Sequence, residues 1–262
     1  MSPTTPAGPV PPAVPRGSVL GRLALAELTL FVREKAGPVL AVWMPMMLLV
    51  VFGNIPFYNR PRQNLGGSTL LDLYVPILAA FVLATVSFNV VPQVLAGYRE
   101  KGVLRRLRTT PVGPARVLAA QLLVNLATAA VSVIALLVVA RLAFGVWMPR
   151  RLGGYVLALV LAALALTAIG LFVAAASPNG RIASAVGATL FYVMMFFAGL
   201  FLPIAAMPAL LRHVCRATPL GAAVQALTDA TEGHGPHPLQ LVTLACYAVV
   251  FGVAAVRLFR WE

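Results

Sequence analysis

Long apolar stretches alternate with short polar ones along most of the chain. A helix needs about 20 apolar residues to cross a bilayer, and six stretches meet this requirement: residues 36–58, 73–96, 116–144, 152–176, 182–202 and 239–256. Pro45 falls inside the first stretch, where it predicts a kink. The pattern therefore predicts an all-α membrane protein with six transmembrane helices.

Two other segments have helical patterns that do not suit a membrane span. In residues 18–35, at about 100° per residue, polar and charged positions form narrow stripes beside a wide apolar face; these positions are Ser18, Arg22, Glu27, Thr29, Arg33 and Glu34. This pattern is typical of a helix at the membrane surface. Residues 203–238 contain two short helical pieces separated by Thr218-Pro219. Neither piece is long enough to cross, so we expect a broken helical section on one side of the membrane, before the last span.

The first 17 residues contain six prolines and no apolar core of a signal peptide. This composition predicts a disordered, Pro-rich tail. Residues 18–262 are then expected to form one transmembrane domain.

Composition agrees with a membrane protein. The chain is 60% hydrophobic and only 10% charged, whereas soluble domains carry about 25% charged residues. The net charge of +13 suggests nucleic acid at first, but much of the Lys and Arg flanks the apolar stretches, which is how membrane proteins set their orientation. Thirteen Lys and Arg fall on the side of the two termini and seven on the other. We therefore expect cytoplasmic termini, a multi-pass position in the plasma membrane of a prokaryote, and no nucleic-acid partner.

The densest charge cluster lies between the second and third predicted spans. Residues 98–111 carry five basic side chains, at Arg99, Lys101, Arg105, Arg106 and Arg108. Pro111 ends a helix near Thr109, and Gly113-Pro114 begins the next one. The pattern predicts a short cytoplasmic helix. Taken alone, such a cluster could also serve as an anchor for acidic lipid head groups.

This segment also resembles a known family. Glu100-x-Gly102-x-Leu104, followed by Thr110-Pro111, resembles the signature of ATP-binding-cassette (ABC) type 2 export permeases, especially drug exporters of the daunorubicin-resistance branch. The resemblance covers nearly the whole chain. It implies that a coupling helix contacts a separate cytoplasmic ATPase subunit through Arg99, Glu100, Gly102, Leu104, Arg105, Arg106, Leu107, Arg108, Thr110 and Pro111. It also implies that residues 18–35 form a connecting helix, with Arg22, Glu27, Arg33 and Glu34 at the ATPase.

The function implied is efflux of a hydrophobic or amphipathic compound, such as a drug, an antibiotic or a lipid-like metabolite. A second permease subunit would complete a homodimer or heterodimer within the membrane lipids. Permeases for lipid-linked glycans or polysaccharides are a weaker match, because this chain has Arg33-Glu-Lys-Ala-Gly-Pro38 where an aromatic, Arg-rich start of the first span is expected.

The chain lacks the loop that cradles nucleotide phosphates. That loop requires Gly-x4-Gly-Lys-Ser/Thr, and the only two lysines, Lys35 and Lys101, each follow a glutamate. We therefore expect a transporter subunit that is not itself an enzyme and binds no cofactor, with ATP and Mg²⁺ held by the partner ATPase. The three histidines are too scattered to predict a metal site.

Polar and soft apolar residues within the spans are the candidates for a substrate path: Asn89, Gln93, Gln121, Asn125, Phe191, Met194 and Met195. The polar ones could equally join helices by hydrogen bonds, and the Phe and Met residues could equally pack against lipid or a dimer partner. No Asp or Glu lies within a predicted span, which argues against a proton relay. Two other classes stay open: an ATP-independent channel or carrier, and a membrane enzyme that modifies lipid.

Overall fold

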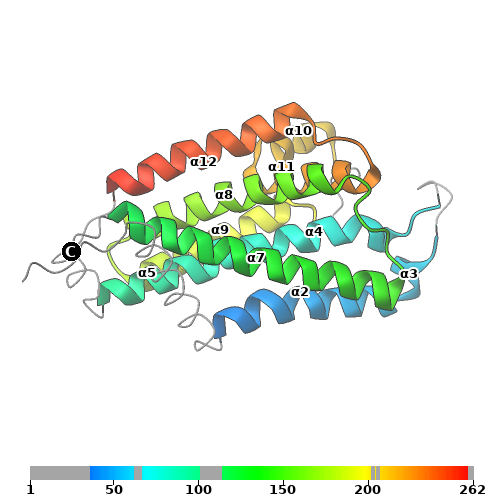
Figure 1. Cartoon of the computed structure of the whole chain (residues 1–262), viewed down its shortest axis with the longest axis horizontal. Coiled ribbons are helices and arrows are strands. Elements are labelled where there is room, and N and C mark those ends of the chain that lie inside the picture. Colours follow the sequence, from blue (N-terminus) through cyan, green and yellow to red (C-terminus); the bar gives the residue numbers. More distant parts are fainter. Residues whose placement is uncertain (1–35, 62–66, 101–113, 202–203, 205–206, 259–262) are drawn as a thin grey trace, which may run out of the picture.

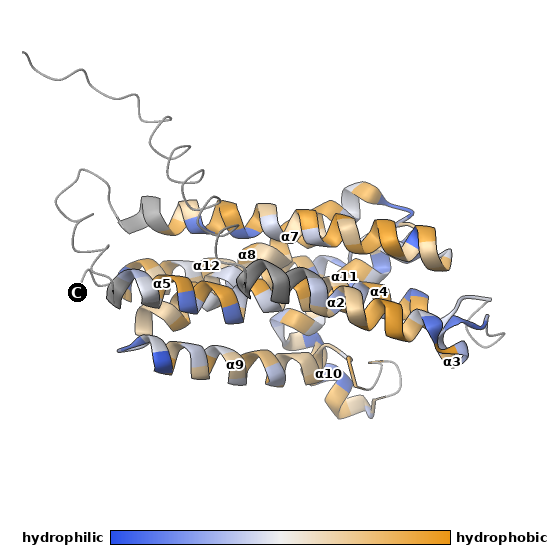
Figure 2. Ribbon diagram, turned by 90° about the horizontal axis from the view of Figure 1, so that it is seen from below, coloured by the Kyte–Doolittle hydropathy of each residue, from blue (hydrophilic) through white to orange (hydrophobic). Residues whose placement is uncertain are grey.

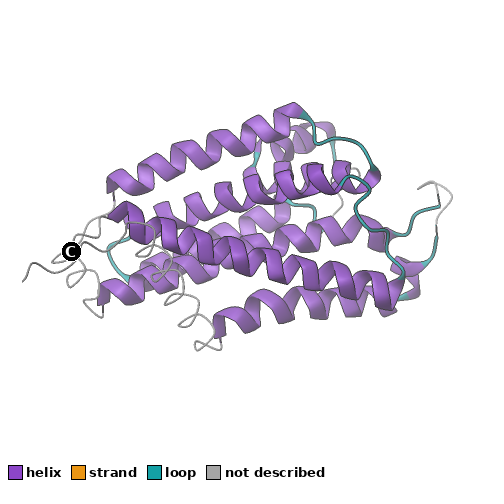
Figure 3. Cartoon of the chain, viewed as in Figure 1, coloured by secondary structure: helices purple, strands orange, loops and turns teal. Residues whose placement is uncertain are grey.

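The structure is a computed structural model that describes residues 36–61, 67–100, 114–201, 204 and 207–258. The described residues form helices and no strand (Figure 3). Five of the helical segments are long and apolar enough to cross a membrane: Leu70–Leu95, Leu118–Phe144, Leu152–Ala176, Gly180–Phe197 and Pro238–Leu258. The predicted fold class, an all-α membrane protein, is confirmed.

The helices follow one another with short connections. Their bounds are α2 (Ala36–Asn54), α3 (Pro56–Asn59), α4 (Leu70–Ala84), η2 (Thr85–Val90), α5 (Val91–Glu100), α7 (Pro114–Phe144), α8 (Leu152–Ala176), α9 (Gly180–Phe197), α10 (Ala209–Ala217), α11 (Pro219–Glu232) and α12 (Pro238–Leu258). The 19-residue α2, with Pro45 inside it, occupies the region of the first predicted span. Helix α9 ends at Phe197, five residues before the predicted boundary. Gly199 beyond it has a positive φ of 87°, a backbone conformation that does not occur within a right-handed α-helix.

The long helices lie side by side along the longest axis of the molecule (Figure 1). The end of α5, the start of α7 and the end of α12 lie together at one end, called here the α5/α7 end. Helices α3, α10 and α11 lie toward the opposite end, called the α10/α11 end (Figure 1). Apolar residues cover the lengths of the helices, and hydrophilic residues are concentrated toward their ends (Figure 2). This distribution suits a bundle whose middle lies in hydrocarbon.

Helix α8 forms the centre of the bundle. It packs against α12, α11, α5, η2 and α7, and its surface is rich in alanine. Ala158, Ala162 and Ala165 are fully buried. Small side chains let helix backbones approach closely, which is the main source of attraction between helices in lipid.

The second span is one continuous helical column from Leu70 to Glu100, interrupted by the π-helical segment η2 at Thr85–Val90. Two glycines face this segment from neighbouring helices. A Cβ atom at Gly170 of α8 would overlap the carbonyl oxygen of Ser87, and one at Gly187 of α9 would overlap that of Phe88. We call these four residues the glycine seam. Glycine is required at both positions because the backbones are in direct contact.

The section before the last span is broken, as predicted. Helices α10 and α11 meet at Thr218, whose hydroxyl donates to the carbonyl of Cys215 (2.7 Å) and accepts from the amide of Gly221 (3.2 Å). A Cβ at Gly221 would overlap the Cys215 carbonyl, so the turn is tight. With 14 residues, α11 is about 21 Å long and cannot cross a bilayer of about 30 Å. The Tyr247 hydroxyl of α12 donates to the Ala217 carbonyl (3.2 Å) and holds the turn against the bundle.

Candidate functional site

The coupling residues predicted from the sequence fall at the α5/α7 end. Arg99 and Glu100 are the last two residues of α5, and the remaining ones, from Gly102 to Pro111, lie outside the described residues, as do Arg22, Glu27, Arg33 and Glu34 of the predicted connecting helix. Helix α5 ends and α7 begins at the same end of the bundle (Figure 1). The segment that joins them therefore connects two long helices at one face of the membrane. The contacts of these residues with an ATPase stay a prediction.

The aromatic and Met residues of α9 divide between the interior and the exposed side of the helix. Phe191 is buried and its ring meets that of Phe81 edge-on, with centroids 5.3 Å apart. Met195 is buried in the same apolar cluster, and the partly buried Met194 packs against it. Their neighbours Tyr192, Val193 and Phe196 are exposed on the other side of the helix. These contacts give Phe191 and Met195 a packing role in this structure, and their part in a substrate path stays a prediction.

The polar residues predicted for the path occupy two different environments. Asn89 lies in η2 and is partly buried, and Gln93 lies one turn further on, exposed on α5. Gln121 and Asn125 of α7 are buried. Their spacing predicts one polar face on the second span and another on the third, and the structure encloses only the one on the third, with Gln121 and Asn125.

Four polar residues form this line along α7, and we call them the α7 polar line: Gln121, Asn125, Thr128 and Ser132. At about 100° per residue they fall within an arc of about 60°. The exposed apolar residues Leu123 and Ile134 lie on the opposite side of the same helix. The polar line therefore faces the bundle, where α7 packs against α2, α4, η2 and α8.

Three of the four side chains in the α7 polar line have a buried polar atom without a hydrogen-bond partner among the described residues. Asn125 is only 1% exposed, and both of its amide atoms lack a partner among the described residues. The same holds for Oε1 of Gln121 and Oγ of Ser132, in side chains that are each 2% exposed. A buried polar group left without a partner costs about 1–3 kcal/mol. This helix face is thus energetically unfavourable in the conformation described.

In the neighbouring helices, by contrast, buried hydroxyls are hydrogen-bonded. Thr85 donates to the carbonyl of Phe81 (2.8 Å), and Ser177 donates to that of Val173 (2.7 Å). Ser87 and Thr167 hydrogen-bond to each other across the η2–α8 contact, with 3.3 Å between their oxygens. These hydroxyls join or stay within the helices, as is common in membrane bundles.

A hollow opens at the α10/α11 end. Its first part, of about 330 Å³, lies between α4, α10 and α11 and is lined by Leu73, Ile77, Ile204, Arg212, Arg216, Val224, Gln225, Thr228, Asp229 and Glu232. An adjoining part of about 220 Å³ shares Leu73, Thr228 and Glu232 and extends to Asp72, Trp147 and Arg150. Its lining combines basic, acidic and apolar side chains, so it can accept a molecule that has both polar and apolar parts.

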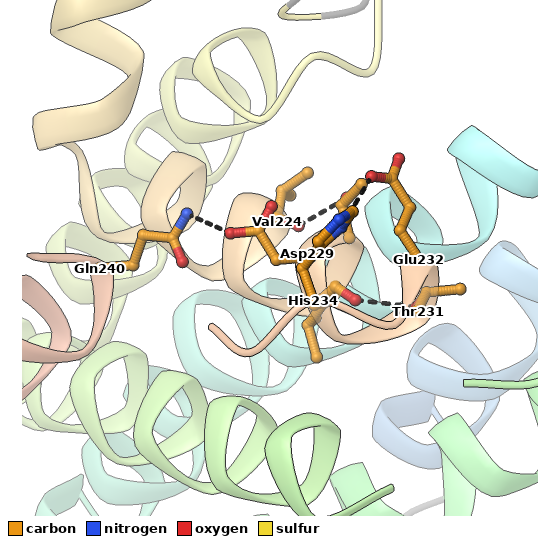
Figure 4. A network of polar contacts seen from close by, with 8 residues as sticks. Val224, Asp229, Thr231, Glu232, His234 and Gln240 are labelled. Atoms are coloured by element: carbon orange, nitrogen blue, oxygen red, sulfur yellow. Dashed lines mark hydrogen bonds and ion pairs between the residues drawn. The ribbon is translucent and has the colours of Figure 1, made fainter. Parts of the chain in front are cut away.

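A polar network fixes the end of α11 beside this hollow (Figure 4). Gln240 of α12 donates from its amide nitrogen to Asp229 (2.9 Å), and His234 lies 3.8 Å from the carboxylate of Glu232. Gly233 ends α11 in the left-handed region, with φ of 95°. The amides of Arg150 and Arg151 donate to the carbonyls of Thr231 (3.5 Å) and Ala230 (3.2 Å), so the α7–α8 loop is attached to the same helix end.

Asp72 completes this attachment, and sequence reasoning missed its role. Its carboxylate accepts from the amide and hydroxyl of Thr69 (2.8 and 2.7 Å), while the Thr69 hydroxyl accepts from the Asp72 amide (3.2 Å), which is a capping box at the start of α4. Its second oxygen accepts from the amide of Trp147 (3.2 Å). The Thr69-x-x-Asp72 spacing could have predicted the cap from the sequence. No sequence pattern predicts the contact with Trp147, which lies 75 residues away.

Comparison with protein families agrees with this architecture. The pattern of the ABC-2 type transporter family matches residues 19–231, which is most of the chain. The chain belongs to this family. No curated protein matches it at a significant level. It is therefore a multi-pass membrane protein and the membrane component of an ABC transporter, that is, a permease. Members of the family generally work with an ATPase subunit and as dimers.

Proposed function

We propose that this chain is the permease subunit of an ABC exporter that moves a hydrophobic or amphipathic compound across the plasma membrane of a prokaryote. A separate cytoplasmic ATPase binds ATP and Mg²⁺, and this chain binds no cofactor of its own. A second permease, identical or related, completes the transporter. The daunorubicin-resistance type of drug exporter, which serves efflux and antibiotic resistance, is the branch that its motif resembles.

The observation that carries this proposal is the family match together with the position of Glu100-x-Gly102-x-Leu104…Thr110-Pro111 in the chain. This motif joins α5 to α7, which end and begin at the same face of the bundle (Figure 1). A force applied there reaches two membrane helices at once. ATP-driven closure of the ATPase dimer would move both, and the transporter would alternate between inward- and outward-facing states whose populations a substrate shifts by its preference.

The orientation follows from charge. The side of the α5/α7 end, which also holds the end of α12, carries thirteen of the twenty Lys and Arg by sequence. Positive residues favour the cytoplasm, so the termini and the coupling segment are cytoplasmic. The hollow between α4, α10 and α11 then opens outward. Its mixed lining supports an amphipathic substrate that leaves the transporter there.

Substitutions at the motif test the proposal. Glu100→Ala and Gly102→Leu should leave the chain inserted in the membrane but abolish ATP-dependent export by the complex with its ATPase. Lys101→Arg, which keeps the charge between them, is the matched control and should export normally. Export is measured as ATP-dependent uptake of a panel of fluorescent drugs and lipid analogues into inside-out vesicles. Normal uptake of a panel member by both variants would refute the coupling role, and equal uptake by vesicles that lack the ATPase would refute the exporter.

A further inference from the structure

Buried polar atoms along the α7 polar line lack hydrogen-bond partners among the described residues. Gln121, Asn125 and Ser132 are nearly fully buried, and at least one polar atom of each has no partner within the described part of the chain. A polar group that serves to join helices would be hydrogen-bonded across the contact, as Ser87 and Thr167 are. A conformation in which these polar atoms meet water or a ligand would satisfy them.

The two ends of α7 are held differently. Beyond its C-terminal end, the amide of Trp147 donates to Asp72, and the amides of Arg150 and Arg151 donate to α11. The guanidinium of Arg141 also donates to the carbonyls of Gly145 and Val146 (3.4 Å each), which closes the helix end. The N-terminal end follows directly on the coupling motif, and its described contact is apolar, because Leu118 packs in a cluster with Leu171 and Ala255. Movement of α7 relative to the bundle would thus begin at the α5/α7 end.

Most of the polar line lies in the N-terminal half of α7, which such a movement would expose. Gln121 is seven residues after the start of the 31-residue helix, and Ser132 is twelve before its end. From Gln121 to Ser132 the helix rises about 16 Å, about half of the hydrocarbon thickness of about 30 Å. A polar line of this length leads from the cytoplasmic end to the middle of the membrane.

We propose that the α7 polar line is one wall of a polar track that opens at the α5/α7 end and admits the polar edge of an uncharged amphipathic substrate. This inference rests on the proposed function and deepens it. The line offers amide and hydroxyl groups and no charge. It suits molecules whose hydroxyl, carbonyl or amide groups lie along one edge of an apolar body. An ionised ligand would lack a counter-charge there, at high cost within the membrane.

The first test needs no transport and no ligand. Asn125→Leu replaces the unpartnered amide by an apolar group with the same number and branching of heavy atoms, so the purified chain should melt about 2–4 °C higher. Ser87→Ala removes a hydroxyl that has a partner, Thr167, and should melt lower. A lower melting temperature for Asn125→Leu would show that the amide has a partner, and would overturn the proposal.

The second test reports whether the track opens. In inside-out membranes that contain the chain and its ATPase, Asn125→Cys and Ser132→Cys are introduced without the exposed Cys246, and treated with the small uncharged reagent methyl methanethiosulfonate. Both should react in one nucleotide state, nucleotide-free or trapped with ATP and vanadate, and be protected in the other. Ser87→Cys, at the glycine seam, should stay protected in both. If Asn125→Cys is as unreactive as Ser87→Cys in both states, the track does not exist.

The two proposals fail in distinguishable ways. If the parent chain neither copurifies with the ATPase nor shows ATP-dependent uptake, the exporter is wrong. If export is ATP-dependent and Asn125→Leu exports at the parent rate, the exporter stands and the track is wrong. Asn125→Gln, which keeps the amide, should export, whereas Asn125→Leu should lose about tenfold in rate, the equivalent of one hydrogen bond in the transition state.

Discussion

The glycine seam and the α7 polar line lie in the same bundle but differ in whether their buried polar side chains are hydrogen-bonded. At the seam, Gly170 and Gly187 bring backbones into contact, and Ser87 and Thr167 hydrogen-bond beside them. Along α7, buried amides and a hydroxyl have no partner within the described helices. Helices that stay packed together gain stability when their buried polar groups are hydrogen-bonded to each other. A helix face that becomes exposed in another conformation can instead leave its polar groups unpaired until it opens. The difference separates a rigid part, α4–η2–α8–α9, from a helix that we expect to move.

The largest effect should come from adding one carbon atom at the seam. Gly170→Ala places a Cβ against the carbonyl oxygen of Ser87, which must push α8 away from η2 and should cost about 2–3 kcal/mol. Gly153→Ala on the same helix is the matched control, because nothing lies within 4 Å of its Cβ position. There the change should be neutral or stabilise by up to about 1 kcal/mol. Thermal unfolding of the two purified variants compares them directly, and equal stability would mean that the seam is not rigid.

The next effect concerns the clamp at the outer end of α7. Asp72→Ala removes both the capping box and the acceptor of the Trp147 amide, and should cost about 1–2 kcal/mol. Asp72→Asn keeps one acceptor oxygen and should lose less. If the clamp holds this end of α7 in place, hydrogen exchange in Asp72→Ala should rise around residues 140–151 and stay unchanged around residues 120–128. A uniform rise along α7 would contradict the view that the two ends are held differently.

A smaller effect distinguishes paired from unpaired hydroxyls. Ser87→Ala leaves Thr167 without its partner and should destabilise by about 0.6–1 kcal/mol. Ser132→Ala removes a hydroxyl that has no partner among the residues described, so it should be neutral or slightly stabilising. The same substitution would then lower the stability at Ser87 but not at Ser132. A double-mutant cycle with Thr167→Val isolates the Ser87–Thr167 coupling, and a coupling near zero would remove the contrast.

The smallest effect is expected at the turn between α10 and α11. Tyr247→Phe deletes the hydroxyl that donates to the Ala217 carbonyl, at a cost of about 0.5 kcal/mol. The partly buried ring should stay in place, stacked on Phe251 at 5.9 Å between centroids. Limited proteolysis at the α10–α11 turn and thermal unfolding would measure the change. A loss above about 2 kcal/mol would show that this turn belongs to the rigid part of the molecule.

Much of the fold was readable because it depends on local properties. Five of the six predicted apolar stretches coincide with described helices long enough to cross a membrane, and Thr218-Pro219 predicted the break between α10 and α11. The predicted coupling motif, which ends in Pro111, also stands out within 14 residues. The candidate path was read from residue type and helical spacing, which predict one polar face on the second span, with Asn89 and Gln93, and another on the third, with Gln121 and Asn125. The structure separated them by burial.

The sequence by itself determined the membrane class, the family resemblance and the position of the coupling motif, because hydrophobicity, charge and short motifs act over a few neighbouring residues. Only the tertiary structure decided which polar groups are paired. Ser87 and Thr167 are 80 residues apart, and Asp72 and Trp147 are 75 apart. It also decided that Asn125 is buried without a partner among the described residues. Hydrogen bonding and close packing depend on distances of a few ångströms between distant parts of the chain, and no local pattern records them.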